Sequence, residues 1–272
     1  MDASFGFQIP IRHIAFNQER DRFDAGFFAF LIIQDLDFPA ALFSKTDGSR
    51  IVFSFSLAGV TNIFWIPWDG SGPVERLTTS KQIQVTASMS PAGRLLAFVE
   101  LSPVVNYDIY YLRIDSRQAS PIISTSYVDG WPEFSPDGRW LAYGSNESGR
   151  LEVYVTPVPG PGRRIPISVE GGREPLWARS GRELFYWSLD SKKLMAVDTV
   201  LQAEFRAGAP RVLFEFQGLA TTPSRVYDVS PDGQRFLIPG PLAIKPVEVT
   251  QLNLVLNWFE ELKRLAPGGK TR

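Results

Sequence analysis

The sequence predicts an all-β protein, a β-propeller of four-stranded antiparallel blades followed by a short C-terminal helix. A short turn motif recurs five times, and its glycines stand at positions 48, 93, 138, 181 and 233. Their separations of 45, 45, 43 and 52 residues match the length of a four-stranded blade. The 272 residues include 20 Phe, 8 Tyr, 7 Trp and 21 Pro, an aromatic-rich and turn-rich composition that favours many short strands.

The turn motif has a clear local chemistry. In Ser-Pro-Asp-Gly, proline presets φ for a type I turn and aspartate tolerates the next position. Glycine then takes the left-handed conformation that starts the next strand of a hairpin. We therefore assign a structural turn role, and no catalytic one, to Asp47, Gly48, Gly93, Asp137, Gly138, Gly181, Asp232 and Gly233.

The residues around each turn predict the strands of a blade. Three residues after each glycine an apolar residue recurs, as expected for one face of a second strand: Ile51, Leu96, Leu141, Leu184 and Phe236. Third strands are expected at 62–66, 108–112, 152–155 and 193–197. Fourth, outer strands are expected at 75–78, 121–124, 165–167 and 212–214, where prolines suit an edge.

The spacing predicts one propeller over residues 1–258. The expected blades are 1–40, which is degenerate, then 41–85, 86–130, 131–172, 173–222 and 223–258. The alternating segment 247–258 would close the ring with the first blade. Six blades fit the length best, and a five-blade ring or a propeller cut from a longer chain are the alternatives. Residues 259–272 are expected to form a short helix and tail.

The units Phe134 to Tyr143 (FSPDGRWLAY) and Val229 to Ile238 (VSPDGQRFLI) resemble the repeats of TolB-like, WD-related β-propellers. The end of the chain, from Tyr227 through Leu254 to Trp258, is similar to the C-terminal propellers of bacterial receptor-type serine/threonine kinases. That resemblance implies a sensor portion outside the cytoplasm. The sequence itself holds no Gly-rich phosphate loop, His-Arg-Asp loop or Asp-Phe-Gly motif, so a kinase domain would have to precede Met1.

Composition excludes several classes of function. The 28 Lys+Arg and 29 Asp+Glu give a net charge of −1, without the basic excess of a nucleic-acid-binding protein. No cysteine is present, so thiolate metal sites and cysteine nucleophiles are excluded. The sequence holds a single histidine, His13, and no Gly-x-Ser-x-Gly motif that would mark the nucleophile of a serine hydrolase. The most apolar stretch, 26–33, is too short to span a bilayer, so we expect no membrane insertion by this chain.

The carboxylates give no catalytic pattern. Candidates near strand ends or loops are Asp108, Glu133, Glu147, Glu152, Glu174 and Asp228, but no spacing selects two of them as a glycosidase pair. No loop has the alternating oxygen ligands of a calcium site. We therefore expect no catalytic residues, no metal and no cofactor.

The predicted function is a non-catalytic binding or scaffold module that takes a protein, peptide or small ligand on one loop face. Trp68, at a strand exit, is the one candidate contact residue. Localisation would be periplasmic or otherwise extracytoplasmic in a membrane-anchored receptor, and cytoplasmic otherwise. The alternatives are a propeller-type glycosidase or lyase, and a TolB-like periplasmic scaffold.

Overall fold

The structure is a computed structural model of the chain. It describes residues 42–44, 49–57, 59–69, 71–102, 107–158, 160, 162–202, 204–216, 225 and 227–238. All of them belong to one compact unit, Met1–Gly240. Every regular element among them is a strand, and we find there no helix with the length and apolarity of a membrane span.

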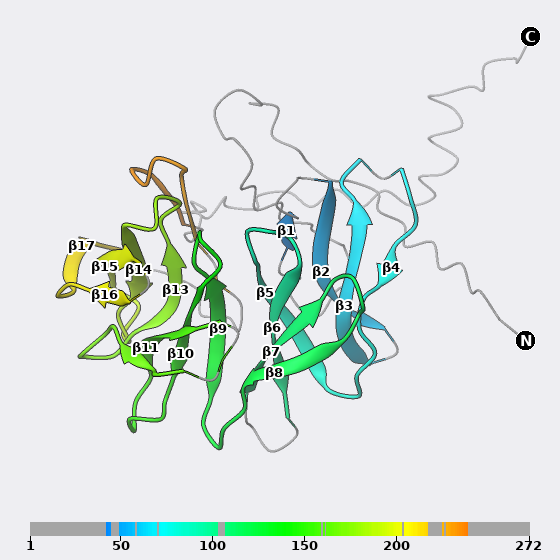
Figure 1. The fold of residues 1–272 in the computed structure, drawn as a ribbon, viewed down its shortest axis with the longest axis horizontal. Helices are drawn as coiled ribbons and strands as arrows, with labels where there is room; N and C mark the ends of the chain where they lie inside the picture. The colour runs from blue at the N-terminus through cyan, green and yellow to red at the C-terminus, as the bar shows by residue number, and fades with distance from the viewer. Residues whose placement is uncertain are drawn as a thin grey trace, which may run out of the picture. The chain divides into compact units, whose positions relative to one another are not determined.

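The strands form successive antiparallel sheets, which we call blades A to D (Figure 1). Blade A contains β1 (Leu42–Ser44), β2 (Arg50–Leu57), β3 (Val60–Pro67) and β4 (Glu75–Arg76). Blade B contains β5 (Ile83–Met89), β6 (Leu95–Leu101), β7 (Tyr107–Arg113) and β8 (Ala119–Ile123). Blade C contains β9 (Asp129–Phe134), β10 (Trp140–Ser145), β11 (Glu152–Pro157) and β12 (Ile165–Pro166).

Blade D and a following hairpin complete the described strands. Blade D contains β13 (Arg173–Trp177), β14 (Glu183–Trp187), β15 (Lys193–Leu201), β16 (Phe205–Ala207) and β17 (Arg211–Glu215). β16 and β17 both pair with β15, and β16 was not expected from the sequence. β18 (Asp228–Val229) pairs with β19 (Phe236–Leu237). Four four-stranded or larger antiparallel sheets therefore agree with the predicted all-β architecture.

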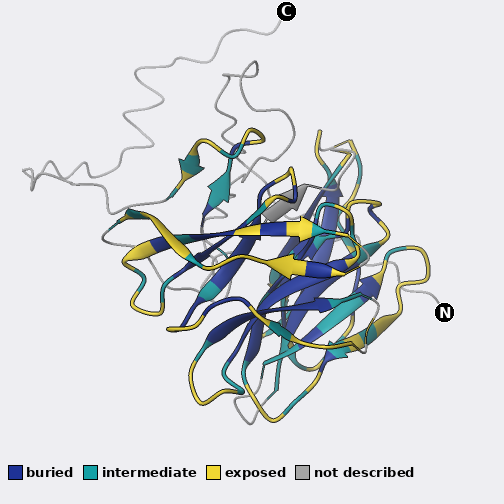
Figure 2. Cartoon of the chain, turned by 60° about the vertical axis from the view of Figure 1, so that its left-hand side comes forward, coloured by how far each residue is buried: buried dark blue, intermediate teal, exposed yellow. Residues whose placement is uncertain are grey.

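The core lies between the blades. The second strands are buried on both faces: Leu96, Ala97 and Phe98 of β6 are each fully buried, and β10 and β14 behave alike (Figure 2). One cluster joins Val52 and Trp65 of blade A to Leu96 and Phe98 of blade B. Equivalent clusters join B to C, C to D, and D to the β18–β19 hairpin. Burial of this apolar surface between sheets is the main force that holds successive blades together.

The strands can be compared with the predicted blade boundaries, whereas other predicted segments lie outside the described residues. β5 and β9 begin three and two residues before the expected blade boundaries at 86 and 131. Their pairing runs back beyond a bulge that the sequence pattern does not mark. The degenerate blade 1–40, His13, the closing segment 247–258 and the helix 259–272 lie outside the described residues.

Candidate functional site

The first strand of blades B, C and D has the same irregularity. In each, the register against the second strand shifts by one residue: at Ala87 in β5, at Trp131-Pro132 in β9 and at Glu174-Pro175 in β13. Trp131 and Glu174 have positive φ values of 52° and 54°. A bulge at one repeated position bends each first strand and changes where its side chains point. Backbone held in this region costs energy, and such positions cluster at functional sites.

These bulges surround a small hollow between the blades. Thr86, Ala87 and Val99 of blade B, Trp131, Pro132 and Glu133 of β9, Pro175 of β13 and Arg225 line it. β9 contacts both β5 and β13, and it lies between them in Figure 1. Its walls are mostly apolar, with one acidic and one basic group, and its volume of about 10 Å³ has room for no more than about one water molecule.

The charged groups of the hollow form a partly buried ion pair. Arg225 Nη1 donates to Glu133 Oε2, and the side chains are only 10% and 16% exposed. Arg225 Nε donates to the carbonyl oxygen of Tyr227 at 3.1 Å. The pair links positions 92 residues apart, and it joins β9 to the segment that leads into β18.

Burial controls the protonation of this pair. Desolvation raises the pKa of Glu133 from 4.5 to about 7, although Arg225 opposes the shift. Burial also raises the pKa of Asp228, again against the pull of Arg225. Burial alone would lower the pKa of Arg225, but the charges of Glu133 and Asp228 raise it. Two carboxylates therefore share one guanidinium in a poorly solvated place.

Tyr227 extends the network to blade D. Its side chain is 1% exposed, and its hydroxyl donates to the carbonyl oxygen of Glu174 at 2.8 Å. Its ring meets Trp187 edge-on, with centroids 5.7 Å apart. Burial raises the pKa of Tyr227 well above 10, so it stays a neutral donor. We call Glu133, Glu174, Arg225, Tyr227 and Asp228 the hub network.

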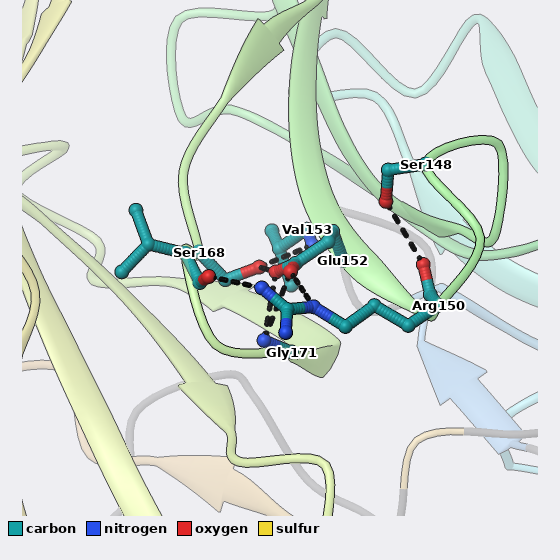
Figure 3. Close-up of polar contacts among 7 residues, drawn as sticks. Ser148, Arg150, Glu152, Val153, Ser168 and Gly171 are labelled. Atoms are coloured by element: carbon teal, nitrogen blue, oxygen red, sulfur yellow. Dashed lines mark hydrogen bonds and ion pairs between the residues drawn. The ribbon is translucent and has the colours of Figure 1, made fainter.

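A second carboxylate, Glu152, forms a clamp at the start of β11 (Figure 3). It accepts from the Ser168 hydroxyl, from the Gly171 amide at 3.0 Å to both carboxylate oxygens, and from Arg150 Nε at 2.6 Å. The Ser168 hydroxyl also accepts from the Val153 amide at 2.8 Å. A shallow depression lined by Ser148, Gly149, Arg150, Tyr154, Pro166 and Val169 adjoins Glu152. The Glu152 carboxylate therefore binds Ser168 and Gly171, in the segment that enters blade D.

The same clamp recurs in two other blades. Asn62, which begins the matching part of β3, binds Ser80 through two hydrogen bonds of 2.7 and 3.3 Å. Asp108 in β7 accepts from the Thr125 amide at 3.3 Å. In each case the first residue of the third-strand core holds the connection to the next blade. This recurrence assigns Asn62, Asp108 and Glu152 to blade joining.

The predicted turn residues lie in hairpin turns wherever they are described. Gly93, Gly138, Gly181 and Gly233 have φ between 66° and 74°. Asp137 accepts from the Ser135 hydroxyl at 2.6 Å and from the Arg139 amide at 3.1 Å. Burial raises its pKa, but these hydrogen bonds and Arg139 outweigh it and leave the pKa lowered. The hydrogen bond from Ser230 likewise lowers the pKa of Asp232. Asp47 and Gly48 lie outside the described residues.

The remaining sequence candidates fall in separate places. Trp68 is 44% exposed beyond the end of β3. Glu147 pairs with Arg164. Of the six candidate carboxylates, those of Glu133 and Asp228 come together around Arg225, whereas Glu174 joins the hub network through its main-chain carbonyl oxygen and its carboxylate lies 3.6 Å from Arg173 Nε. In the part of the chain that the structure describes, no group of three or more acidic, histidine or cysteine side chains is arranged to hold a metal.

Sequence reasoning missed the hub network because its partners are far apart in the chain. Arg225 carried no motif, and Glu133 was one carboxylate among six. One signal was present: Glu133 and Asp228 stand at the same place in their repeats, five residues before the turn glycine. Ser88 and Leu176 occupy that place in the other described repeats.

Comparison with known proteins finds three curated relatives by sequence. The chain is 28% identical over 184 residues to an uncharacterized protein of Agrobacterium fabrum, covering 65% of this chain and 61% of that protein. It is 27% identical over 149 residues to a TolB homolog of Chlorobium luteolum, covering 40% and 34%. It is 29% identical over 133 residues to tricorn protease homolog 1 of Streptomyces coelicolor, covering 48% and 11%. No protein-family model matches the sequence.

Solved structures agree. The structure of a putative TolB from Agrobacterium tumefaciens superposes with a TM-score of 0.57 at 22% identity, covering 71% of this chain and 70% of that one. TolB from Acinetobacter baumannii superposes with a TM-score of 0.58 at 17% identity, covering 72% and 48%. This chain has a TolB-like β-propeller fold. The TolB-like propeller is distantly related to TolB and tricorn protease, and it spans less than two thirds of the length of these curated relatives.

Proposed function

We propose that this TolB-like propeller is a non-catalytic binding module that recognises a protein or peptide on one loop face. In an antiparallel blade, the turn between strands one and two lies at one end. The connection that enters the next blade lies at the other end. We call these ends the turn face and the entry face.

The observation that carries the proposal is a series of exposed apolar side chains on the entry face. Ile83, Tyr127 and Val169 lie at the entries to blades B, C and D and are 37%, 43% and 67% exposed. Leu189, in the β14–β15 connection at the same end, is also exposed. Exposed apolar groups that recur at one end of a rigid scaffold favour a binding surface. Trp68, the candidate from sequence, lies at the turn face.

The polar groups support the same proposal, because many of the carboxylates already have hydrogen-bond partners within the scaffold. The turn aspartates are used by hairpins, the clamp residues by blade joining, and Glu133 by Arg225. Turn, clamp and ion-pair contacts therefore engage the carboxylates of Asp137, Asp232, Glu152 and Glu133. We expect the purified chain to bind without turning over substrate.

The test is quantitative cross-linking with extracts of the source cell. A variant with Ile83→Ser, Tyr127→Ser and Val169→Ser should lose the cross-linked partners of the parent protein. A matched turn-face variant, Trp68→Ser with Val200→Ser, removes comparably exposed apolar groups and should keep them. Equal partner yields from both variants, each with the thermal midpoint of the parent, would contradict the entry-face proposal.

One observation favours a catalytic alternative. Glu133 has a pKa near 7, as a general acid or base requires, and it borders a hollow with room for about one water molecule. A panel of glycosides and uronides would test it with Glu133→Gln. Turnover that survives purification and disappears in this variant, while Glu147→Gln retains it, would favour an enzyme over a binding module.

We also propose, from the sequence resemblance, that the module senses a ligand for a larger bacterial signalling protein such as a receptor-type serine/threonine kinase. The tricorn protease homolog supports a modular use of such segments, because the match covers only 11% of it. Sequencing the coding region upstream of Met1 tests this. Kinase motifs followed by a membrane span would support it, and an open frame with neither would contradict it.

A further inference from the structure

The outer edges of the blades differ in how they are protected. An exposed edge strand offers unpaired backbone groups to other chains, and short strands and prolines prevent such pairing. β4 and β12 have only two residues each, and β12 contains Pro166. β8 contains Pro121. Blades A, B and C are therefore blunted at their outer edges.

The outer strand of blade D, β17, is neither as short as β4 and β12 nor interrupted by proline, and its one irregularity is the register shift at Leu213. β16 and β17 follow one another along β15, and the five residues of β17 include no proline. Val212 and Leu213 are 49% and 39% exposed. In the described part of the chain, β17 pairs with no strand other than β15. Figure 1 places β17, in yellow, at the left margin of the drawing.

The sequence of β17, Arg-Val-Leu-Phe-Glu, is complementary to itself. If two copies pair antiparallel about Leu213, Arg211 faces Glu215 of the second copy at both ends. Val212 then faces Phe214, and Leu213 faces Leu213. Opposite charges and apolar pairs directly across a ladder stabilise it. The register shift at Leu213 leaves this residue out of the ladder with β15, on a strand that is mostly exposed.

We propose that two copies of this chain associate through β17, in antiparallel register about Leu213. The result is a two-fold symmetric dimer in which each copy presents the same strand. Five paired residues make a small interface, so the dimer is weak and depends on protein concentration. The proposal is independent of the entry face, which lies elsewhere on the blades.

Disulfide cross-linking tests this pairing directly, because the chain contains no cysteine. Leu213→Cys places one thiol of each copy on the two-fold axis, within reach of a disulfide. Under mild oxidation at protein concentrations up to about 1 mM, this variant should form covalent dimers at least ~10-fold faster than Val169→Cys. Val169 is more exposed but lies on the entry face. Equal rates for the two variants would overturn the proposal.

A charge exchange tests the register. Arg211→Glu gives two acidic ends and Glu215→Arg gives two basic ends, so neither variant should self-associate in sedimentation velocity. A mixture of the two should form a heterodimer, because each acidic end then meets a basic one. Arg211 also contacts Glu183 and Asp198 within its own chain, so circular dichroism must show that both variants are folded. Failure of the folded variants to associate on mixing would overturn the register, as would self-association of either one.

Discussion

The carboxylates of the hub network and those of the hairpin turns differ in the direction of their pKa shifts. Asp137 and Asp232 sit in turns where nearby hydroxyls and amides stabilise the charged form and lower the pKa. Glu133 and Asp228 lie between blades, where burial outweighs Arg225 and raises the pKa. Carboxylates one residue before the turn glycine therefore stabilise a local turn. Those five residues before it interact with Arg225, which is distant from Glu133 in the sequence.

Removal of Arg225 should have the largest effect of the changes that separate these regions. Arg225→Met leaves the partly buried Glu133 and Asp228 without the guanidinium they share. We expect the free energy of unfolding to fall by about 3–5 kcal/mol, as for a broken buried pair. Urea denaturation measures it. Arg113→Met, which breaks the exposed pair with Asp115, is the control and should leave the midpoint unchanged. Similar losses of unfolding free energy from both variants would mean that the Arg225 pair stabilises the fold no more than an exposed pair does.

The turn glycines should show the next largest effect, graded by their surroundings. A Cβ at Gly181 would lie 2.4 Å from Leu201 Cδ1, whereas one at Gly233 meets nothing within 4 Å. Both residues have positive φ, which costs about 1–2 kcal/mol with a side chain. Gly181→Ala should cost about 1 kcal/mol more than Gly233→Ala, because Leu201 must shift. Thermal melts of the two variants give the comparison, and a reversed order would contradict it.

The pH dependence of stability should separate the two regions. The folded pKa of Glu133 is about 7, above the ordinary 4.5, so the folded state holds this proton more tightly. The resulting stability is full below pH 4.5 and is lost as the pH rises to 7, by on the order of 1–3 kcal/mol. Glu133→Gln should flatten the slope between these values. Urea titrations every half unit test it, and an unchanged slope in the variant would contradict the assignment.

Asp137 should behave in the opposite sense and more weakly. Its folded pKa is lowered, so its contribution is present above pH 3.8 and is lost as the pH falls through the lowered value. Asp137→Asn should cost about 0.5–1 kcal/mol at pH 7. It should leave the slope between pH 4.5 and 7 unaltered. A change in that upper slope would mean that the turn and the hub network are coupled.

The turns could be predicted from sequence because their chemistry is local. Ser135 to Arg139 contains the donors, the acceptor and the glycine that make the hairpin. The second and third strands followed from their distance to the glycine. The hub network could not be predicted, because Glu133 meets Arg225 across 92 residues and only the packing of successive blades brings them together. β16 was missed because β15 runs on to Leu201 without a break in its pattern.

The protonation of Glu133 is the most direct test of this account. A carbon-13 titration of its side-chain carboxyl, assigned by comparison with Glu133→Gln, would give the midpoint in the folded chain. Desolvation of Glu133 beside Arg225 predicts a midpoint near 7. A midpoint near the ordinary 4.5 would mean that the carboxyl is solvated and that the hub network is not the buried joint described above.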